Sequence, residues 1–149
     1  MTMTGPARAV DDSETPMGEH VVGGSASFDR PGSGLLNVQQ NTNRVVIDWN
    51  TFNIGKKAKT EFFQPNSGSL AVNRVTGAND DPSQILGTLK ANGNVMILDR
   101  NGVLFGADST IDVNGIIAST GNINVDDVMN GNSKVVLSNF GSGAVINEG

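Results

Sequence analysis

Few side chains in this sequence could carry out catalytic or metal-binding chemistry. His20 is the only histidine, and there is no cysteine. A Ser–His–Asp triad or a histidine-based zinc site is hard to assemble around one histidine when cysteine is lacking. We therefore interpret His20 as a solvated residue at the start of a strand. The lack of cysteine also excludes disulfides and thiol catalysis.

Two pairs of adjacent carboxylates, Asp80-Asp81 and Asp126-Asp127, are the next candidates for chemistry. Glycosidases place two carboxyl groups across a cleft, about 5 to 10 Å apart. Adjacent acids in an extended segment point apart, and both pairs lie among turn-forming residues. We interpret them as solvated loop acids, which makes a polysaccharide-cleaving enzyme the least favoured of the functions considered.

Two further segments, Asp99–Gly102 (DRNG) and Asp112–Gly115 (DVNG), carry oxygen-bearing side chains at alternate positions, as calcium loops do. An EF-hand loop needs oxygen ligands at positions 1, 3 and 5, glycine at position 6 and glutamate at position 12. Counted from Asp99, position 5 is Val103 and position 6 is Leu104. Both segments are therefore predicted to be turns, and the sequence indicates no metal and no cofactor.

The aromatic side chains could form either a sugar-binding platform or part of a packed core. The residues concerned are Trp49, Phe52, Phe62, Phe63 and Phe105. In a fold built from short strands, aromatic side chains stack inside or seal an end more often than they line a groove. We expect Trp49, Phe52 and Phe105 to be structural core residues. Phe62 and Phe63 must face opposite ways if their segment is extended.

The elements that position these residues are short apolar runs separated by turns, and the clearest set lies between Ala91 and Thr120. Asn-Gly dipeptides, which tolerate positive φ at little cost, separate three of these runs. The runs are Val95–Leu98, Val103–Phe105 and Ile116–Ala118, and the dipeptides are Asn92-Gly93, Asn101-Gly102 and Asn114-Gly115. Such a stretch forms either successive faces of a coil or an antiparallel meander, because Asn-Gly is also a strong hairpin signal.

The rest of the chain has the same texture. Helical periodicity is weak throughout, so we expect an all-β fold with almost no helix. Residues 1–19 are polar and are expected to form a flexible arm, followed by short strands from residue 20 to residue 149. The expected strands include His20–Phe28 with a Gly-Gly bend, Ile123–Val125, Lys134–Leu137 and Ala144–Ile146. Strands that recur to the last residue suggest the front of a longer protein.

Composition argues against two classes of protein. The net charge of −5 disfavours a nucleic-acid surface, which needs a basic stripe. No apolar run approaches the length of a membrane span, and Met1–Glu19 has no apolar central region typical of a signal peptide. We therefore expect neither a nucleic-acid-binding nor a membrane-spanning protein.

Several blocks of residues, in a fixed order, resemble those of a known family. The closest are VVIDWNTFNIG at Val45–Gly55, AVNRVTG at Ala71–Gly77, ILG at Ile85–Gly87 and ILDRNGVLFG at Ile97–Gly106. Together they resemble the secretion domain, of the haemagglutination-activity type, of filamentous haemagglutinin-like exoproteins. These exoproteins are the substrates of two-partner secretion in Gram-negative bacteria. The resemblance covers about Val21 to Asn124.

This resemblance implies a right-handed parallel β-helix (a solenoid), with an N-terminal β-cap over about residues 20–40, coils over about residues 41–149 and an extra-helical hairpin. It also implies a non-enzymatic domain that an outer-membrane β-barrel transporter recognises and that nucleates the folding of a longer passenger, often an adhesin. Such a passenger crosses the periplasm and is secreted or displayed at the cell surface, where it can bind a host or cell-surface ligand. The alternative function is a self-standing surface adhesin or carbohydrate-binding module.

The central corner departs from the family pattern. The family usually has Asn-Pro-Asn-Gly followed by Ile or Val, whereas this chain has Asp99-Arg100-Asn101-Gly102-Val103. Asp is a good first residue of a turn and Asn-Gly is kept, so we expect the turn to persist. These five residues are our candidate partner-recognition or corner motif. The second family signature, Asn-Pro-Asn-Leu, is absent from the sequence.

Overall fold

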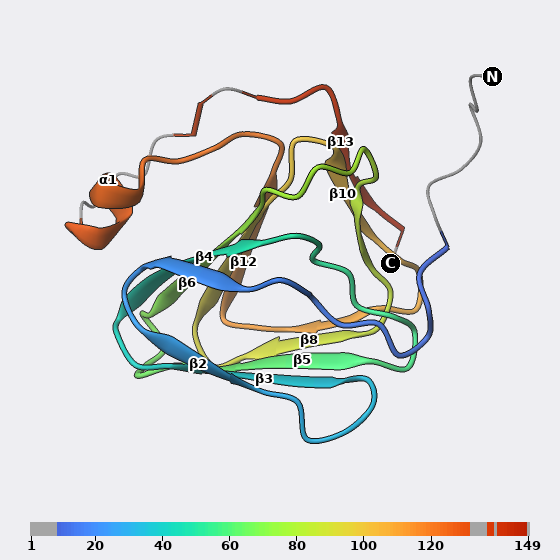
Figure 1. Ribbon diagram of the computed structural model, residues 1–149, viewed down its shortest axis with the longest axis horizontal. Coiled ribbons are helices and arrows are strands. Elements are labelled where there is room, and N and C mark those ends of the chain that lie inside the picture. The colour runs from blue at the N-terminus through green and yellow to red at the C-terminus, as the bar shows by residue number, and fades with distance from the viewer. Residues whose placement is uncertain (1–8, 132–136, 139, 149) are drawn as a thin grey trace.

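The computed structural model describes residues 9–131, 137–138 and 140–148. The strands are β1 (His20–Gly23), β2 (Ala26–Asp29), β3 (Leu35–Gln40), β4 (Arg44–Trp49), β5 (Lys59–Phe63), β6 (Leu70–Val75), β7 (Ser83–Ile85), β8 (Thr88–Ala91), β9 (Asn94–Leu98), β10 (Gly102–Phe105), β11 (Thr110–Asp112), β12 (Gly115–Ser119) and β13 (Ala144–Asn147), and the helix is α1 (Val125–Met129). They form three sheets that enclose one interior (Figure 1), with strand orders β1-β4-β6-β9-β12, β13-β10-β7 and β11-β8-β5-β3-β2.

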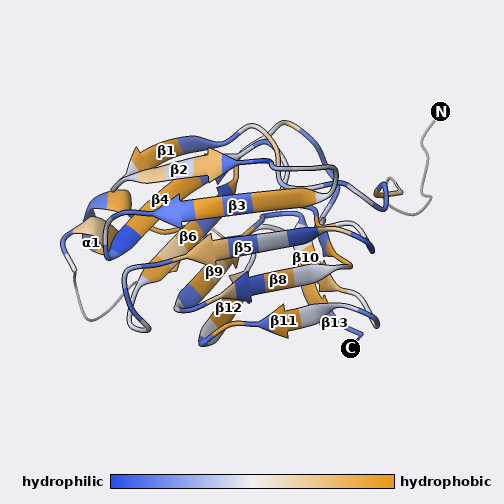
Figure 2. Cartoon of the chain, turned by 90° about the horizontal axis from the view of Figure 1, so that it is seen from below, coloured by the Kyte–Doolittle hydropathy of each residue, from blue (hydrophilic) through white to orange (hydrophobic). Residues whose placement is uncertain are grey.

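Successive turns of the chain stack their strands in parallel. Figure 2 shows one such stack, in which β3, β5, β8 and β11 lie one above the next. β9 and β12, on either side of the second and third Asn-Gly dipeptides, also pair in parallel. The chain is therefore a parallel β-helix of about four turns, and the antiparallel meander is ruled out.

Parallel register lines up equivalent residues of successive turns in columns. Val45 lies opposite Ala71, and Ala71 lies opposite Val95, so one column fills the interior with aliphatic side chains. Alternate residues face outward, because side chains alternate along a strand. The outward column of Val46 and Val72 is nevertheless buried, since a second apolar cluster covers it from outside the sheet.

The N-terminal end of the solenoid is closed by antiparallel strands. The expected strand over His20–Phe28 is divided into β1, which pairs with β4, and β2, which pairs with β3. Residues 11–19 do not form the flexible arm that the sequence suggested. The Glu14 carbonyl accepts a 2.9 Å hydrogen bond from the Gly55 amide, and the Met17 amide donates one of 3.1 Å to the Thr51 carbonyl.

The segment between β12 and β13 leaves the sheets and carries α1. The strand predicted over Ile123–Val125 is wrong, because this sequence caps a helix. The Asn124 side chain accepts a hydrogen bond from the Asp127 amide, and the first turn of α1 is acidic. Val128 of α1 is buried in the cluster over β4 and β6.

Two further strands were expected near the C-terminus. Most of the strand expected over Lys134–Leu137 lies outside the described residues. The strand expected over Ala144–Ile146 is confirmed as β13, which pairs in parallel with β10. Within the described part of the chain, no helix has the length and apolar character that a membrane span requires.

Candidate functional site

The candidate motif, Asp99–Val103, forms the corner between β9 and β10, hereafter the Asp99 corner. The Gly102 amide donates a 2.9 Å hydrogen bond to the Asp99 carbonyl, which closes a β-turn. Gly102 has φ +109°, in the left-handed region that favours glycine. The local sequence therefore makes the turn without the proline that is usual in the family.

Gly93 and Gly115 do not take the positive φ that the sequence suggested. They are needed instead because neighbouring turns approach them closely. A Cβ on Gly93 would lie 2.8 Å from Gln64 Oε1, and a Cβ on Gly115 would lie 2.6 Å from Asn94 Oδ1. These two Asn-Gly dipeptides therefore serve the spacing between turns of the solenoid.

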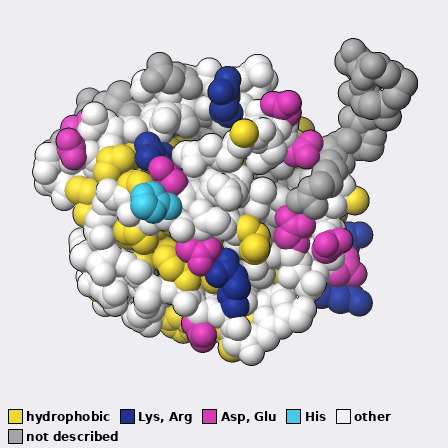
Figure 3. Space-filling view, in the orientation of Figure 1, with side chains coloured by type: hydrophobic (Ala, Val, Ile, Leu, Met, Phe, Trp, Pro, Cys, Tyr) yellow, Lys and Arg dark blue, Asp and Glu magenta, His cyan; other side chains and the backbone are white. Residues whose placement is uncertain are grey.

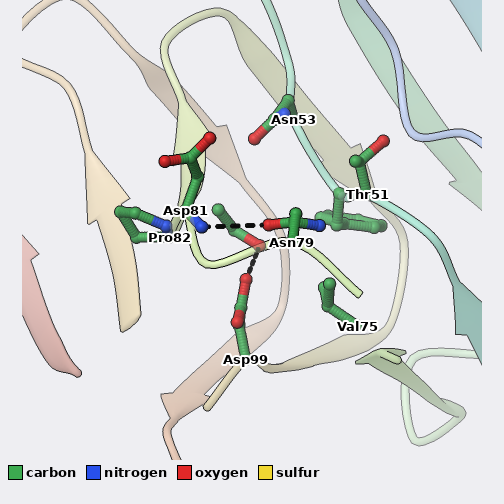
Figure 4. Close-up of a pocket in the computed structure, with 9 residues that line it drawn as sticks. Thr51, Asn53, Val75, Asn79, Asp81, Pro82 and Asp99 are labelled. Atoms are coloured by element: carbon green, nitrogen blue, oxygen red, sulfur yellow. Dashed lines mark hydrogen bonds between the residues drawn. The ribbon is translucent and has the colours of Figure 1, made fainter. Parts of the chain in front are cut away.

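The Asp99 side chain points inward and is only 1% exposed. Ser83 Oγ donates a 2.7 Å hydrogen bond to one carboxylate oxygen, and the Asn101 amide donates one of 2.9 Å to the other (Figure 4). Burial raises the pKa of the Asp99 carboxyl, and the hydrogen bonds from Asn101 and Ser83 oppose this rise. Because Ser83 belongs to β7, the carboxylate ties the corner to the preceding turn.

Asn101 braces the corner against the loop that precedes β7. Its Nδ2 donates a 2.8 Å hydrogen bond to the Asn79 carbonyl. Asn79 in turn donates from its own Nδ2 to the Asn50 carbonyl at 3.2 Å, and its Oδ1 accepts from the Asp81 amide at 3.1 Å. The corner is thus part of a hydrogen-bonded stack that crosses three turns of the solenoid.

A pocket of about 50 Å³ lies beneath this stack, with Phe52, Asn53 and Asp99 in its walls (Figure 4). A buried water needs roughly 10 to 15 Å³ by the same measure, so the pocket holds a few waters at most. It is too small for a sugar or an organic cofactor. The corner therefore offers no small-molecule site on its inner side.

The corner residues differ in what they present to solvent. Gly102 and Val103 are buried, and Asn101 is half-buried. Arg100 is the exposed member, while its carbonyl accepts a 3.1 Å hydrogen bond from the Gly143 amide. A protein that binds the folded domain can therefore read the Arg100 side chain, whereas Asp99 and Val103 act inside the fold.

Comparison with known proteins identifies the family. The model of the TPS secretion domain, the secretion domain of two-partner secretion, matches residues 15–149. The chain belongs to this family. It is also similar to the solved structure of the HMW1 secretion domain from Haemophilus influenzae, with a TM-score of 0.79 and 30% sequence identity over 90% of this chain and 35% of that one.

Two curated relatives of this TPS domain are much longer proteins. Both are named heme/hemopexin-binding protein and come from Haemophilus influenzae. One is 37% identical over 137 residues, which is 91% of this chain and 15% of the relative. The other is 35% identical over 119 residues, which is 80% of this chain and 12% of the relative. The chain thus spans a small fraction of the length of each of these relatives.

The three aromatic residues expected to be structural differ in burial within the TPS domain. Trp49 and Phe52 are buried, and their ring centroids lie 5.5 Å apart in an edge-on arrangement. Trp49 Nε1 donates a 3.0 Å hydrogen bond to Oδ1 of the buried Asn73. Phe105 is only half-buried, at the margin of the core. Phe62 faces inward and Phe63 is 40% exposed, as the alternation of an extended strand requires.

The other candidates for chemistry are not brought together. His20, the cyan side chain in Figure 3, is exposed on the cap. Asp126 and Asp127 lie in the first turn of α1, and Asp80 and Asp81 lie in the loop before β7. Among the residues that the structure describes, no three histidine, cysteine or acidic side chains form a group that could hold a metal ion.

Sequence reasoning missed a second functional corner, which we call the amide corner and define by Gln40, Gln64, Asn92 and Gly93. Gln64 Nε2 donates to Gln40 Oε1 at 3.1 Å, and Gln64 Oε1 accepts from the Gly93 amide at 2.7 Å. Asn92 Oδ1 accepts from the Gln64 amide at 2.7 Å. One signal was available: Gln40 and Gln64 each stand directly after an apolar strand and before a turn-rich segment.

Proposed function

We propose that this TPS domain is the part of a longer exoprotein that a partner outer-membrane transporter recognises, and that it starts the folding of the remainder. The observation that carries the proposal is the family match over residues 15–149. The length of the relatives supports it, since the chain spans only 15% and 12% of them. A domain that forms so small a part of an exoprotein is suited to direct its transport.

Free strand edges supply a physical route for recognition. β1 and β2 lie at one end of their sheets, and β11, β12 and β13 lie at the other. The edge of a sheet presents unpaired N–H and C=O groups, to which an extended segment can add as a further strand. We infer that the transporter binds segments of this chain by strand addition while the chain is still extended.

The same geometry supports a role in nucleating folding. Each new turn of a parallel solenoid pairs with the turn before it, so a completed turn is a template for the next. β11, β12 and β13 are the template strands that this domain would offer to a downstream passenger. The antiparallel cap formed by β1 and β2 gives this growth one direction. The passenger would cross the periplasm and end secreted or at the cell surface.

The test is an export assay with the whole chain placed between a signal peptide and a reporter passenger. We expect the passenger to reach the medium or the cell surface only when the partner transporter is present. A matched fusion without this chain measures leakage. Equal export with and without the transporter would contradict the proposal.

A further inference from the structure

A second and larger hollow lies beside the Asp99 corner, on the outer surface of the solenoid. It has a volume of about 340 Å³ and lies where the ends of β6 and β9 meet residues 121–122 and 140–141. Arg74, Arg100, Asn122 and Phe140 form much of its wall. Its volume falls within the range of sites that bind ligands.

The hollow is positively charged in an acidic chain. Its wall contains two guanidinium groups and no carboxylate, although the chain has 15 acidic and 10 basic residues. Asp48 neutralises Arg74 through a two-pronged pair, with Nε–Oδ1 at 2.7 Å and Nη2–Oδ2 at 2.9 Å. The Arg100 guanidinium has no acidic partner among the described residues. The free positive charge of the hollow is therefore that of Arg100.

Phe140 adds an exposed aromatic ring to the wall. It is 64% exposed, the largest value among the exposed large apolar side chains of the described chain. The ring passes close over Gly121, where a Cβ would lie 2.9 Å from it. Arginine and aromatic side chains are the types that most often dominate the energy of protein interfaces. An arginine without a partner and an exposed ring thus share one hollow.

We propose that this hollow is where the transporter reads the folded domain, and that it takes an acidic peptide segment of the transporter. A carboxylate of that segment pairs with Arg100, and a neighbouring apolar side chain packs on Phe140. This inference rests on the proposed function and gives the partner its chemistry. A peptide is favoured over an acidic sugar because sugar sites need several converging polar groups, and here Thr76 and Asn122 alone accompany the two arginines.

The test is the affinity of the purified whole chain for the purified periplasmic part of the transporter, measured by calorimetry at low salt. Arg100→Glu is expected to weaken binding about tenfold or more, because reversal sets like charges against each other. Phe140→Ala should weaken it by a smaller factor, and added salt should weaken the wild type more than Arg100→Glu. Lys56→Glu, a charge reversal at an exposed turn before β5, is the matched control and should stay within about twofold.

Each outcome decides between the two proposals. If the wild type does not bind the transporter, the proposed function fails. If Arg100→Glu keeps its melting temperature and binds as the wild type does, this inference fails alone. Equal losses for Arg100→Glu and Lys56→Glu would mean that net charge decides binding, which also overturns it. Displacement of the transporter by polygalacturonate from the wild type but not from Arg100→Glu would assign the hollow to an acidic sugar instead. Arg100→Gln provides a second variant should Arg100→Glu not fold.

Discussion

The amide corner and the Asp99 corner turn the same solenoid with different chemistry. At the amide corner, neutral side chains from successive turns bond to one another, with Gln64 between Gln40 and Gly93. At the Asp99 corner, a buried carboxylate receives hydrogen bonds from Ser83 and Asn101. Both corners satisfy their buried polar groups, but the second also contains a group that can ionise.

This difference follows from what each side chain can donate and accept. A carboxamide has both a donor and an acceptor end, so each turn can satisfy the next and the pattern can repeat. An ionised carboxylate only accepts, so it ends a chain of hydrogen bonds. We therefore expect the amide corner to contribute mainly to stability. The Asp99 corner should contribute sensitivity to pH and, through Arg100, a surface that a partner can read.

Gln64→Leu should have the largest effect on stability. The substitution keeps the approximate size of the side chain but leaves the Gly93 amide and the Asn94 carbonyl without their bonds to Gln64. Each buried polar group left unpaired costs about 1 to 3 kcal/mol, so we expect a loss of about 3 kcal/mol in the free energy of unfolding. Urea denaturation followed by Trp49 fluorescence measures it.

Gln39→Leu is the matched control for that variant, because Gln39 is the exposed neighbour of Gln40 in the same strand. It should change the free energy of unfolding by less than about 0.5 kcal/mol. If both variants lose the same amount, the stacked amides do not stabilise the solenoid and the contrast between the corners is lost.

Gly102→Ala should have the next largest effect, at the Asp99 corner. The new Cβ would meet the Ala144 carbonyl oxygen at 2.5 Å, in a backbone conformation with φ +109°. Gly131 has φ +72° with nothing within 4 Å of an added Cβ, so Gly131→Ala measures the conformational cost alone. We expect Gly131→Ala to cost about 1 kcal/mol and Gly102→Ala about 2 kcal/mol. Equal losses would mean that β13 moves aside without cost.

How much of this could be read from the sequence differs between the two corners. The Asp99 corner was predictable, because Asp at the first turn position and Asn-Gly at the end are local signals. The amide corner was not, because Gln40 and Gln64 are 24 residues apart and meet only when the turns stack in register. Local patterns indicate where a solenoid turns, whereas the bonds between turns depend on a register that no short segment encodes.

The error at α1 has a similar cause. Ile123 and Val125 are apolar and alternate with a polar residue, which favours a strand in isolation. Asn124 between them caps a helix whose Val128 is buried against the outer column of Val46 and Val72. Because that column is exposed until α1 covers it, burial between distant segments decides the structure here.

Asp99→Asn should remove the pH sensitivity of its corner. Burial raises the pKa of the Asp99 carboxyl, so the folded state holds this proton more tightly than the unfolded state. The stability linked to Asp99 is therefore present below its ordinary pKa and is lost as the pH rises through the raised value. An amide does not ionise, so the melting temperature of Asp99→Asn relative to the wild type should rise between about pH 3 and pH 7.

Glu19→Gln is the control of opposite sign. The hydrogen bond from Arg30 lowers the pKa of Glu19, so its stabilisation is present above the ordinary glutamate pKa and is lost as the pH falls through the lowered value. The melting temperature of Glu19→Gln relative to the wild type should therefore fall over the same rise in pH. Parallel shifts in both variants would show that Asp99 does not titrate as its burial predicts.

Arg100→Pro should have the smallest effect on stability, and its sign separates the structural role of the corner from recognition. The substitution introduces the proline that is usual in the family at the second position of a turn, where proline is favoured. The Arg100 amide donates no hydrogen bond to a described residue, so none is lost. Fewer unfolded conformations should stabilise the domain by about 0.5 kcal/mol, or about 1 to 2 °C in melting temperature. The same variant removes the free guanidinium and should bind the transporter more weakly, whereas Arg100→Ala should lose binding without the gain in melting temperature. A lower melting temperature for Arg100→Pro would contradict the turn geometry, and unchanged binding would return recognition to the strand edges alone.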